Sequence, residues 1–264
     1  MKIGICGYGF VGNAIGTFFT ERGYSVTIYD KYKDINTFDV LLDTDIVFIC
    51  LPTNYDDTLK SYNMKEINET LEMLNRYSYS GITVIKSTIL PKYCHNMNDK
   101  YQKLSIVANP EFLSVKTAVE DFRDQKHVVL GYTGKSKGVI KEVEGIYREE
   151  LGDIVITVVD ADEAALIKLG CNSFYATKIE YFTELYMLCK SVGVSYENVK
   201  KGMLENGWIN SKHTEVPGGD GKVSYGGMCL PKDIKALSGY MEEMESINGV
   251  IKGVIEERER LRGY

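Results

Sequence analysis

The stretch KIGICGYGFVGNAIGTFFTER, residues 2–22, decides the fold of this chain. It begins with a short apolar strand (2–6), passes through a glycine-rich turn and continues as an amphipathic helix (11–22). Glycines spaced as GxGxxG allow a tight turn and a close approach of the backbone to a pyrophosphate, whose charge the helix N-terminus stabilises. The stretch therefore predicts a dinucleotide site at the turn. The residues predicted to bind the cofactor there are Gly7, Gly9, Phe10, Val11 and Gly12.

Asp30 supports the same interpretation. It ends the next predicted strand, 18 residues after Gly12, where a ribose-binding carboxylate is expected. A carboxylate at this place would repel the 2′-phosphate of NADP, so the predicted cofactor is NAD. The alternative is an ordinary glycine-rich turn, with Asp30 as an ordinary residue at the end of a strand. The strand before the turn and the helix after it favour the dinucleotide site.

The rest of the first 159 residues alternates apolar strands with helical patterns, which predicts a Rossmann-like α/β domain with a doubly wound parallel sheet over 1–159. A second, all-helical domain is predicted over 160–264, with helices at 161–192, 195–206 and 232–262. Asp160 and Glu163 form a capping-box pattern at the start of the long helix. The predicted strands are 2–6, 25–30, 45–52, 82–87, 104–109, 127–132 and 153–159, and the predicted helices of the first domain are 11–22, 64–77, 91–102 and 135–150.

Composition narrows the classes of function. The formal net charge is -6, whereas a domain that binds nucleic acid is usually basic. No apolar run is long enough to span a membrane, and Met1 leads directly into a strand without a leader pattern, so a cytoplasmic protein is expected. The six cysteines form no CxxC pair, so we predict no metal site.

Cys229 lies in YGGMCLPKD, residues 225–233, just before a predicted helix. Pro231 suits the first helical turn, and a thiol near a helix N-terminus and Lys232 is expected to ionise readily. By itself, a cysteine after two glycines is more often a small buried thiol than a nucleophile. The choice between these two interpretations depends on the rest of the chain.

Six motifs in order along the chain resemble the nucleotide-sugar dehydrogenases, which oxidise UDP-glucose, GDP-mannose or UDP-N-acetylmannosamine. They are GYGFVG (7–12), LPTNY (51–55), KSTI with Pro91 after Leu90 (86–91), NPEFL (109–113), IKLGCN (167–172) and YGGMCLPKD (225–233). The resemblance implies two successive NAD-dependent oxidations of a primary alcohol to a carboxylate, through a cysteine thiohemiacetal and thioester. It implies a nucleotide-sugar substrate, UDP-glucose above all, and favours Cys229 as the nucleophile.

The resemblance also assigns roles to other residues. Lys168 and Asn172, four residues apart on one helix face, would hold oxygens that develop charge, and Asp233 would position water or act as a base. Glu111 would activate water, and Thr88 would lie near the nicotinamide and that water. Thr53 would contact the cofactor, although Thr53 and Thr88 could equally be turn-capping residues. The residues predicted to bind substrate are Glu111, Phe112, Leu113, Lys168, Asn172, Tyr225, Gly226 and Gly227.

Four departures from the family pattern affect substrate and cofactor binding. The segment between Asp30 and Asp45 is short, Val115 replaces a cofactor-binding glutamate, and Ser224 stands where glycine is usual and is expected to crowd the sugar. The family's third, C-terminal domain, which holds the nucleotide, is not expected here. The loop 210–227 is a candidate replacement, with the alternative of a solvated loop. Its basic residues are Lys212, His213 and Lys222.

The long helix 161–192 is apolar on more than one face, which together with the resemblance predicts a homodimer through this helix. Two competing hypotheses remain open. One is an NAD-dependent dehydrogenase of a smaller phosphorylated alcohol or hydroxy acid, which would not need Cys229. The other is a catalytically silent NAD-binding partner protein.

Overall fold

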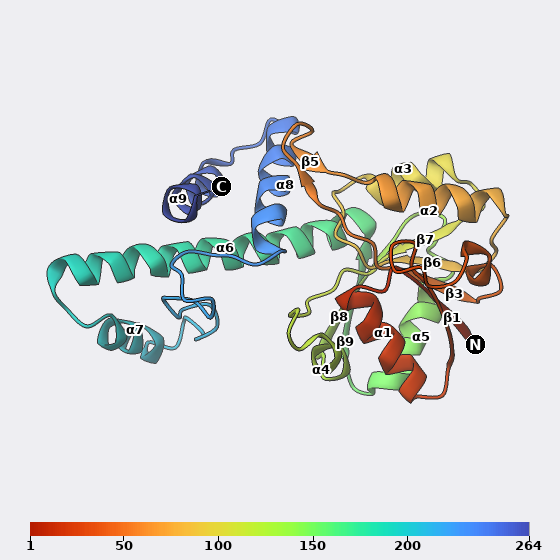
Figure 1. Cartoon of the computed structure of the whole chain (residues 1–264), viewed down its shortest axis with the longest axis horizontal. Coiled ribbons are helices and arrows are strands. Elements are labelled where there is room, and N and C mark those ends of the chain that lie inside the picture. The colour runs from red at the N-terminus through yellow and green to blue at the C-terminus, as the bar shows by residue number, and fades with distance from the viewer. Residues whose placement is uncertain (264) are drawn as a thin grey trace. The chain divides into compact units, whose positions relative to one another are not determined.

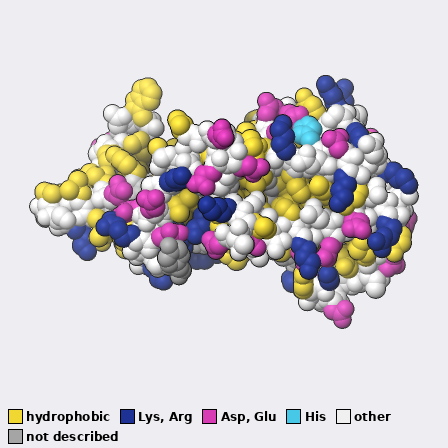
Figure 2. Space-filling model, turned by 90° about the horizontal axis from the view of Figure 1, so that it is seen from above, with side chains coloured by type: hydrophobic (Ala, Val, Ile, Leu, Met, Phe, Trp, Pro, Cys, Tyr) yellow, Lys and Arg dark blue, Asp and Glu magenta, His cyan; other side chains and the backbone are white. Residues whose placement is uncertain are grey.

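The computed structural model describes residues 1–263 and divides the chain into two compact units (Figure 1). The first unit comprises Met1–Asn54 and Tyr62–Lys168, and the second comprises Tyr55–Ser61 and the chain from Leu169 onward. Tyr264, the end of the predicted second domain, lies outside the described residues. Lysine and arginine are intermixed with aspartate and glutamate over the face drawn in Figure 2.

The first unit is built on a seven-stranded sheet with the order β2-β1-β3-β6-β7-β8-β9. The chain leaves β1 to one side for β2 and returns to the other side for β3, so the strand order reverses at β1. Ligands of such sheets bind at the carboxyl ends of the strands at this switch point. The strands are β1 (Lys2–Cys6), β2 (Ser25–Tyr29), β3 (Ile46–Ile49), β6 (Ile82–Ile85), β7 (Ser105–Ala108), β8 (His127–Tyr132) and β9 (Val155–Asp160).

The predicted Rossmann-like, doubly wound parallel sheet is confirmed, except that its last two strands run the opposite way. The five strands from β2 to β7 are parallel, but β8 runs antiparallel to β7, with Ala108 paired to Gly131. β9 then pairs parallel with β8. An apolar run shows that a strand is buried but not which way it runs, because direction depends on where the preceding connection returns to the sheet.

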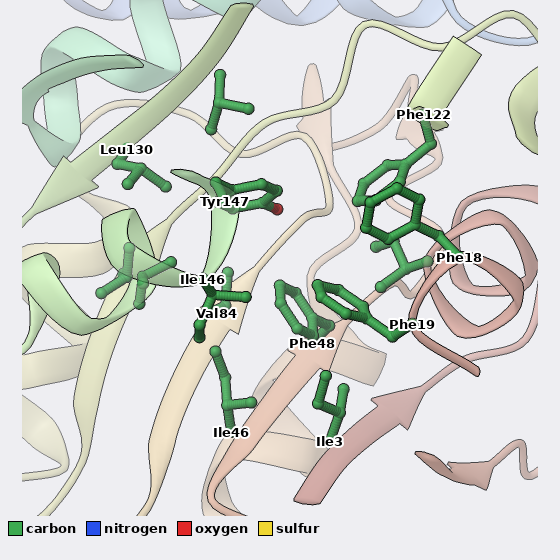
Figure 3. Close-up of a cluster of buried hydrophobic side chains, with 14 of the residues drawn as sticks. Ile3, Phe18, Phe19, Ile46, Phe48, Val84, Phe122, Leu130, Ile146 and Tyr147 are labelled. Atoms are coloured by element: carbon green, nitrogen blue, oxygen red, sulfur yellow. The ribbon is translucent and has the colours of Figure 1, made fainter. Parts of the chain in front are cut away.

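Alternate residues of each strand serve two separate cores. Ile3, Phe48 and Val84 face a cluster that includes Phe18 and Phe19 of α1 and Tyr147 of α5 (Figure 3). Val47, Ile49 and Ile85 face a second cluster with α2 (Lys65–Arg76), α3 (Tyr93–Lys100) and the first turns of α6 (Ala161–Val192). Helices therefore cover both faces of the sheet, as near-continuous apolar strands require. The helices of this unit are α1 (Phe10–Glu21), the 3-10 turn η1 (Phe38–Leu41), α2 (Lys65–Arg76), α3 (Tyr93–Lys100), α4 (Ala118–Arg123) and α5 (Ile140–Leu151).

The long predicted helix is confirmed as α6 (Ala161–Val192), which runs from the first unit into the second. Its start is capped as predicted, because the Asp160 backbone N–H donates to Glu163 Oε2 at 2.9 Å. The other elements of the second unit are α7 (Tyr196–Glu205), α8 (Leu230–Glu243) and α9 (Gly249–Arg262). A hairpin of β4 (Tyr55–Asp56) and β5 (Ser61–Tyr62), absent from the prediction, supplies the residues 55–61 that join this unit.

The prediction of one helix over 232–262 is wrong, because α8 and α9 are separate helices. Glu245 has a φ of 52°, and the N–H groups of Glu245 and Ser246 bond back to the carbonyls of Glu242 and Met241. This pair of bonds is a Schellman motif, which ends a helix at a left-handed residue. Helical periodicity continues across the break, so the pattern of apolar residues did not reveal it.

Within residues 1–263, no helix combines the length and the apolar character needed to cross a membrane.

Candidate active site

The glycine turn after β1 has the geometry of an anion site. Gly7 has a φ of +90°, and a Cβ at Gly12 would lie 2.0 Å from the Gly7 carbonyl oxygen, so these two positions admit only glycine. A Cβ at Gly9 would meet nothing within 4 Å, which leaves the outer side of the turn open. Gly9 is also the N-cap of α1 and supplies no side-chain cap, so the first N–H groups of the helix are available to a phosphate.

Asp30 lies beside this turn. Its Oδ2 accepts a hydrogen bond from the Tyr8 backbone N–H at 2.7 Å, and its Oδ1 accepts bonds from the N–H groups of Tyr32 and Lys33. Asp30 is nine-tenths buried, and its Oδ2, which accepts one bond, has a lone pair left for a further donor. The structure therefore places the predicted ribose carboxylate next to the predicted pyrophosphate turn. Tyr8 is bonded through both of its backbone groups, because Lys33 Nζ donates to the Tyr8 carbonyl at 2.6 Å.

The other predicted site residues of the first unit follow neighbouring parallel strands. Thr53 follows β3, Thr88 follows β6, and Glu111 follows β7, and all three are buried. Because β1, β3, β6 and β7 are parallel neighbours, their carboxyl ends meet at the same edge of the sheet as the glycine turn. The structure thus brings these residues to the edge where an open α/β sheet binds its ligands.

Glu111 and Lys168 form a buried ion pair. Lys168 Nζ donates to the Glu111 carbonyl at 2.6 Å and to Glu111 Oε1 at 3.1 Å, and both side chains are more than nine-tenths buried. Glu111 Oε2 accepts from the Leu113 N–H at 2.6 Å. The Phe112 ring lies under the Lys168 ammonium, 5.2 Å from its centroid. Lys168 is therefore a buried, paired lysine and not a solvated one.

Sequence reasoning missed a buried lysine directly behind Glu111. Lys86 Nζ donates to Asn109 Oδ1 at 3.0 Å, Tyr147 Oη donates to the same oxygen at 2.5 Å, and Asn109 Nδ2 donates to the Val129 carbonyl. Burial lowers the pKa of Lys86 to about 8. This network fixes Asn109, two residues before Glu111. The available signal was a lysine inside the apolar strand ITVIKS (82–87).

In the second unit, Asn172 and Asp233 are directly bonded. Asn172 Nδ2 donates to Asp233 Oδ2 at 2.6 Å, and Lys232 Nζ donates to Asp233 Oδ1 at 2.6 Å. Asp233 is fully buried. Its backbone N–H donates to the Cys229 carbonyl at 3.0 Å, because Cys229 is the N-cap of α8 and this is the first bond of the helix. Cys229 is partly exposed, and Pro231 lies in the first turn as predicted.

The residues before Cys229 lie in a loop that is bonded to α6. Ser224 is buried, its N–H donates to Thr183 Oγ1 at 3.0 Å, and its hydroxyl donates to Glu180. The Ser224 side chain was expected to crowd a sugar, but its hydroxyl is bonded to Glu180 of α6. The Tyr225 ring lies in a core cluster, so only the backbone of Tyr225 is available to a ligand. Gly226 is partly exposed and Gly227 is exposed, with a φ of +79° at Gly227.

The three basic residues proposed for a diphosphate differ in their environments. The His213 ring packs on the Tyr175 ring with centroids 4.6 Å apart, and burial lowers the pKa of His213. Lys212 and Lys222 are exposed. Within residues 1–263 no hydrogen bond joins the three side chains, so their role in binding a diphosphate stays a prediction.

Among the described residues, one group has the spacing of metal ligands. Ligand atoms of His95, Asp160 and Asp162 lie within 4.8 Å of one another. Lys92 Nζ lies 2.6 Å from Asp162 Oδ2, and the Asp162 N–H occupies Asp160 Oδ1. The Lys92 ammonium therefore already pairs with Asp162, a backbone N–H binds Asp160, and the group lies at the start of α6.

Two family models match the chain. The NAD-binding domain of the UDP-glucose/GDP-mannose dehydrogenase family matches residues 34–151, and the central domain of the same family matches residues 162–259. The UDP-glucose 6-dehydrogenase of Rickettsia bellii is 28% identical over 97% of this chain and 66% of its own length. The chain spans between about half and two thirds of the length of the first curated relatives that it matches.

Solved structures show the same fold. A UDP-glucose dehydrogenase from the archaeon Pyrobaculum islandicum superposes with a TM-score of 0.87 at 21% identity, covering 98% of this chain and 68% of that one. The 3-hydroxyisobutyrate dehydrogenase of Mycobacterium tuberculosis has a TM-score of 0.77 at 14% identity, covering 97% of this chain and 91% of that one. At these identities the likeness concerns the fold.

Proposed function

Because the chain belongs to the UDP-glucose/GDP-mannose dehydrogenase family, we propose that it takes part in the NAD-dependent oxidation of a nucleotide sugar, with UDP-glucose, oxidised to UDP-glucuronate, as the substrate. NAD would accept the hydride that leaves the sugar carbon in each of the two oxidations. The glycine turn, Asp30, Thr53 and Thr88 are proposed to hold this cofactor, since they occupy the carboxyl edge of the sheet.

Cys229 is proposed as the nucleophile. Its thiolate would add to the aldehyde carbon made in the first oxidation and form a thiohemiacetal, whose second oxidation leaves a thioester. Hydrolysis breaks the carbon–sulfur bond, returns the thiolate and releases the carboxylate. The observation that carries the proposal is the link between Cys229 and a buried acid–amide pair, because Asp233 bonds Asn172 one helical turn after Cys229.

The charged pairs suit the remaining steps. Lys168 and Asn172 are four residues apart on α6, so their side chains lie on the same helix face. An ammonium and an amide placed there would stabilise an oxyanion on the substrate. Glu111 would take the proton of the water that attacks the thioester, with Lys168 keeping the carboxylate in place. Phe112, Leu113 and the backbone of residues 225–227 are proposed to line the sugar.

The proposal is tested by NADH formation at 340 nm with a panel of nucleotide sugars. We expect two NADH per sugar and loss of overall turnover in Cys229→Ser. Cys171→Ser, which changes another partly exposed cysteine, is the matched control and should keep turnover. One NADH per substrate, together with unchanged turnover in Cys229→Ser, would instead support a hydroxy-acid dehydrogenase. The match with the Mycobacterium tuberculosis 3-hydroxyisobutyrate dehydrogenase, which covers 91% of that chain, makes this the alternative to test. NAD binding without turnover on any substrate would support the silent partner protein.

We also propose a homodimer through α6. Phe174, Tyr181 and Leu188 are seven residues apart, and their exposed fractions are 63%, 54% and 58%. Apolar residues repeated every seven positions form a seam that winds slowly around the helix and can pair with a second copy of itself. Hydrophobic side chains also gather at the surface of the left-hand part of Figure 2. Light scattering should give twice the chain mass for the wild type and for Tyr77→Glu, an exposed control, and the monomer mass for Tyr181→Glu.

A further inference from the structure

Arg262 lies in the last turn of α9, and all three nitrogens of its guanidinium donate hydrogen bonds to one loop. Nε donates to the Val223 carbonyl at 2.7 Å, Nη1 donates to Asp220 Oδ2 at 2.6 Å, and Nη2 donates to the Ser224 carbonyl at 2.5 Å. Nη2 also reaches Asp220 Oδ1 at 3.3 Å. The side chain is only 11% exposed. Arg262 therefore binds the stretch 220–224, which ends five residues before Cys229.

The loop is shaped to receive this side chain. A Cβ at Gly226 would lie 2.5 Å from Arg262 Nη1 and 3.1 Å from its Cζ, so the guanidinium lies directly against the backbone of Gly226. A planar fork of N–H donors can bind a carboxylate and two carbonyls together, which an ammonium cannot do. The Arg262 guanidinium holds the pKa of Asp220 at about 2, so the pair stays charged across the working pH range.

The opposite side of the same loop is held by α6. Ser224 donates to Thr183 and Glu180, and the Tyr225 ring is buried in a cluster with Ala176 of α6 and Val254 of α9. Ser224 and Gly227 have φ values of 64° and 79°, in the left-handed region that needs support from the surroundings when the residue is not glycine. Arg262 and α6 therefore clamp Ser224 from two sides.

We propose that Arg262 is a positioning residue for Cys229, which fixes the loop 220–227 and thereby the placement of the thiol at the N-terminus of α8. The importance of this placement for turnover rests on the proposed function, whereas the effect on the loop does not. A shift of a reacting group by about 1 Å can cost about 100-fold in rate. Arg262 acts on the thiol through the backbone of the loop to which its guanidinium is bonded.

The test compares Arg262→Ala and Arg262→Lys with Arg260→Ala. Arg260 is a matched control, because it lies on the same helix, is 72% exposed and forms an ion pair with Glu257. Iodoacetamide alkylation of Cys229, followed by mass spectrometry over pH 6–10, reports the state of the thiol without requiring turnover. Steady-state kinetics with UDP-glucose and NAD, and thermal melting, complete the comparison.

For Arg262→Ala we expect the midpoint of the alkylation profile to move to higher pH, and kcat to fall by about 10- to 100-fold with the KM for NAD unchanged. Arg262→Lys should recover part of both effects, and Arg260→Ala should show neither. If Arg262→Ala does not fold, Arg262→Lys and Asp220→Asn provide the same readouts with a smaller perturbation. An unchanged alkylation profile and kcat in a variant with a lowered melting temperature would overturn the proposal and leave Arg262 a purely structural tie.

Failure of the two proposals can be told apart. Turnover that persists in Cys229→Ser would remove the nucleophile from the proposed function, while the alkylation profile of Arg262→Ala would still show whether Arg262 positions the thiol.

Discussion

Lys168 binds both the backbone and the side chain of Glu111, with its Nζ 2.6 Å from the carbonyl oxygen and 3.1 Å from Oε1. Neither side chain is more than 7% exposed. A charge pair at this depth depends on each partner, because removal of one leaves the other desolvated and uncompensated. The same two residues therefore contribute to the stability of the first unit and to the reaction proposed above.

Lys168→Met should lower the free energy of unfolding by about 3–5 kcal/mol, because the Glu111 carboxylate loses its buried partner. Turnover should fall at least about 100-fold. The double variant Lys168→Met/Glu111→Gln removes both charges and should regain much of the stability without regaining turnover. Urea denaturation and NADH formation measure the two effects. Equal stability of the single and double variants would show that the pair is not coupled.

Gly12→Ala and Gly9→Ala separate folding of the glycine turn from cofactor binding. The methyl group at position 12 would lie 2.0 Å from the Gly7 oxygen, so the turn must move, and both the melting temperature and NAD binding should decrease. The methyl group at position 9 meets no protein atom within 4 Å. Gly9→Ala should keep the melting temperature but weaken NADH binding at least about tenfold, because the methyl occupies the approach of the pyrophosphate. Unchanged NADH fluorescence titration in Gly9→Ala would contradict a cofactor site at this turn.

Asn172→Asp should make stability depend on pH. The change places a second carboxyl at the position 2.6 Å from Asp233 Oδ2, and two carboxylates that close cannot both ionise without repulsion. The pKa of the pair should therefore rise, so the variant should be stable at acidic pH and lose stability as pH increases through that raised pKa. Thermal melts at pH 5 and pH 8 test this expectation. Asn172→Ala, which adds no charge, is the control and should show no comparable difference between the two pH values.

Lys86→Met should reveal the cost of burying an ammonium. Burial lowers the pKa of Lys86 from 10.5 to about 8, so the native state binds fewer protons than the unfolded state between these values. The contribution of Lys86 to stability should therefore rise with pH across this window and be least favourable below pH 8. The stability of Lys86→Met relative to the wild type should be up to about 3 kcal/mol more favourable at pH 7 than at pH 11.

Urea denaturation of both proteins from pH 7 to pH 11 measures this difference. Lys116→Met, which changes an exposed lysine of the same unit, is the control. A difference between Lys86→Met and the wild type that does not vary with pH would show that the ammonium is not desolvated.

Local chemistry was enough to predict the elements that depend on neighbouring residues. The strand, glycine turn and helix of residues 2–22 and the cap of α6 at Asp160 follow from short-range sterics and hydrogen bonding, so the sequence alone revealed them. The break after Met244 is also local, but it depends on a left-handed Glu245 that no glycine or proline signals. Helical periodicity continued past it, which explains the error.

The tertiary structure alone decided which polar groups meet. Glu111 and Lys168 are 57 residues apart, and Asn172 and Asp233 are 61 apart, so no spacing rule connects them. The same holds for Lys86 behind Asn109, and for Arg262 against Gly226. The sequence by itself determined the fold class and the cofactor turn, because these follow from periodicity and local geometry, whereas the candidate reactive residues came from the resemblance of its motifs to a known family. The pairing of buried charges depends on how strands and helices distant in the chain pack together, and only the folded structure shows it.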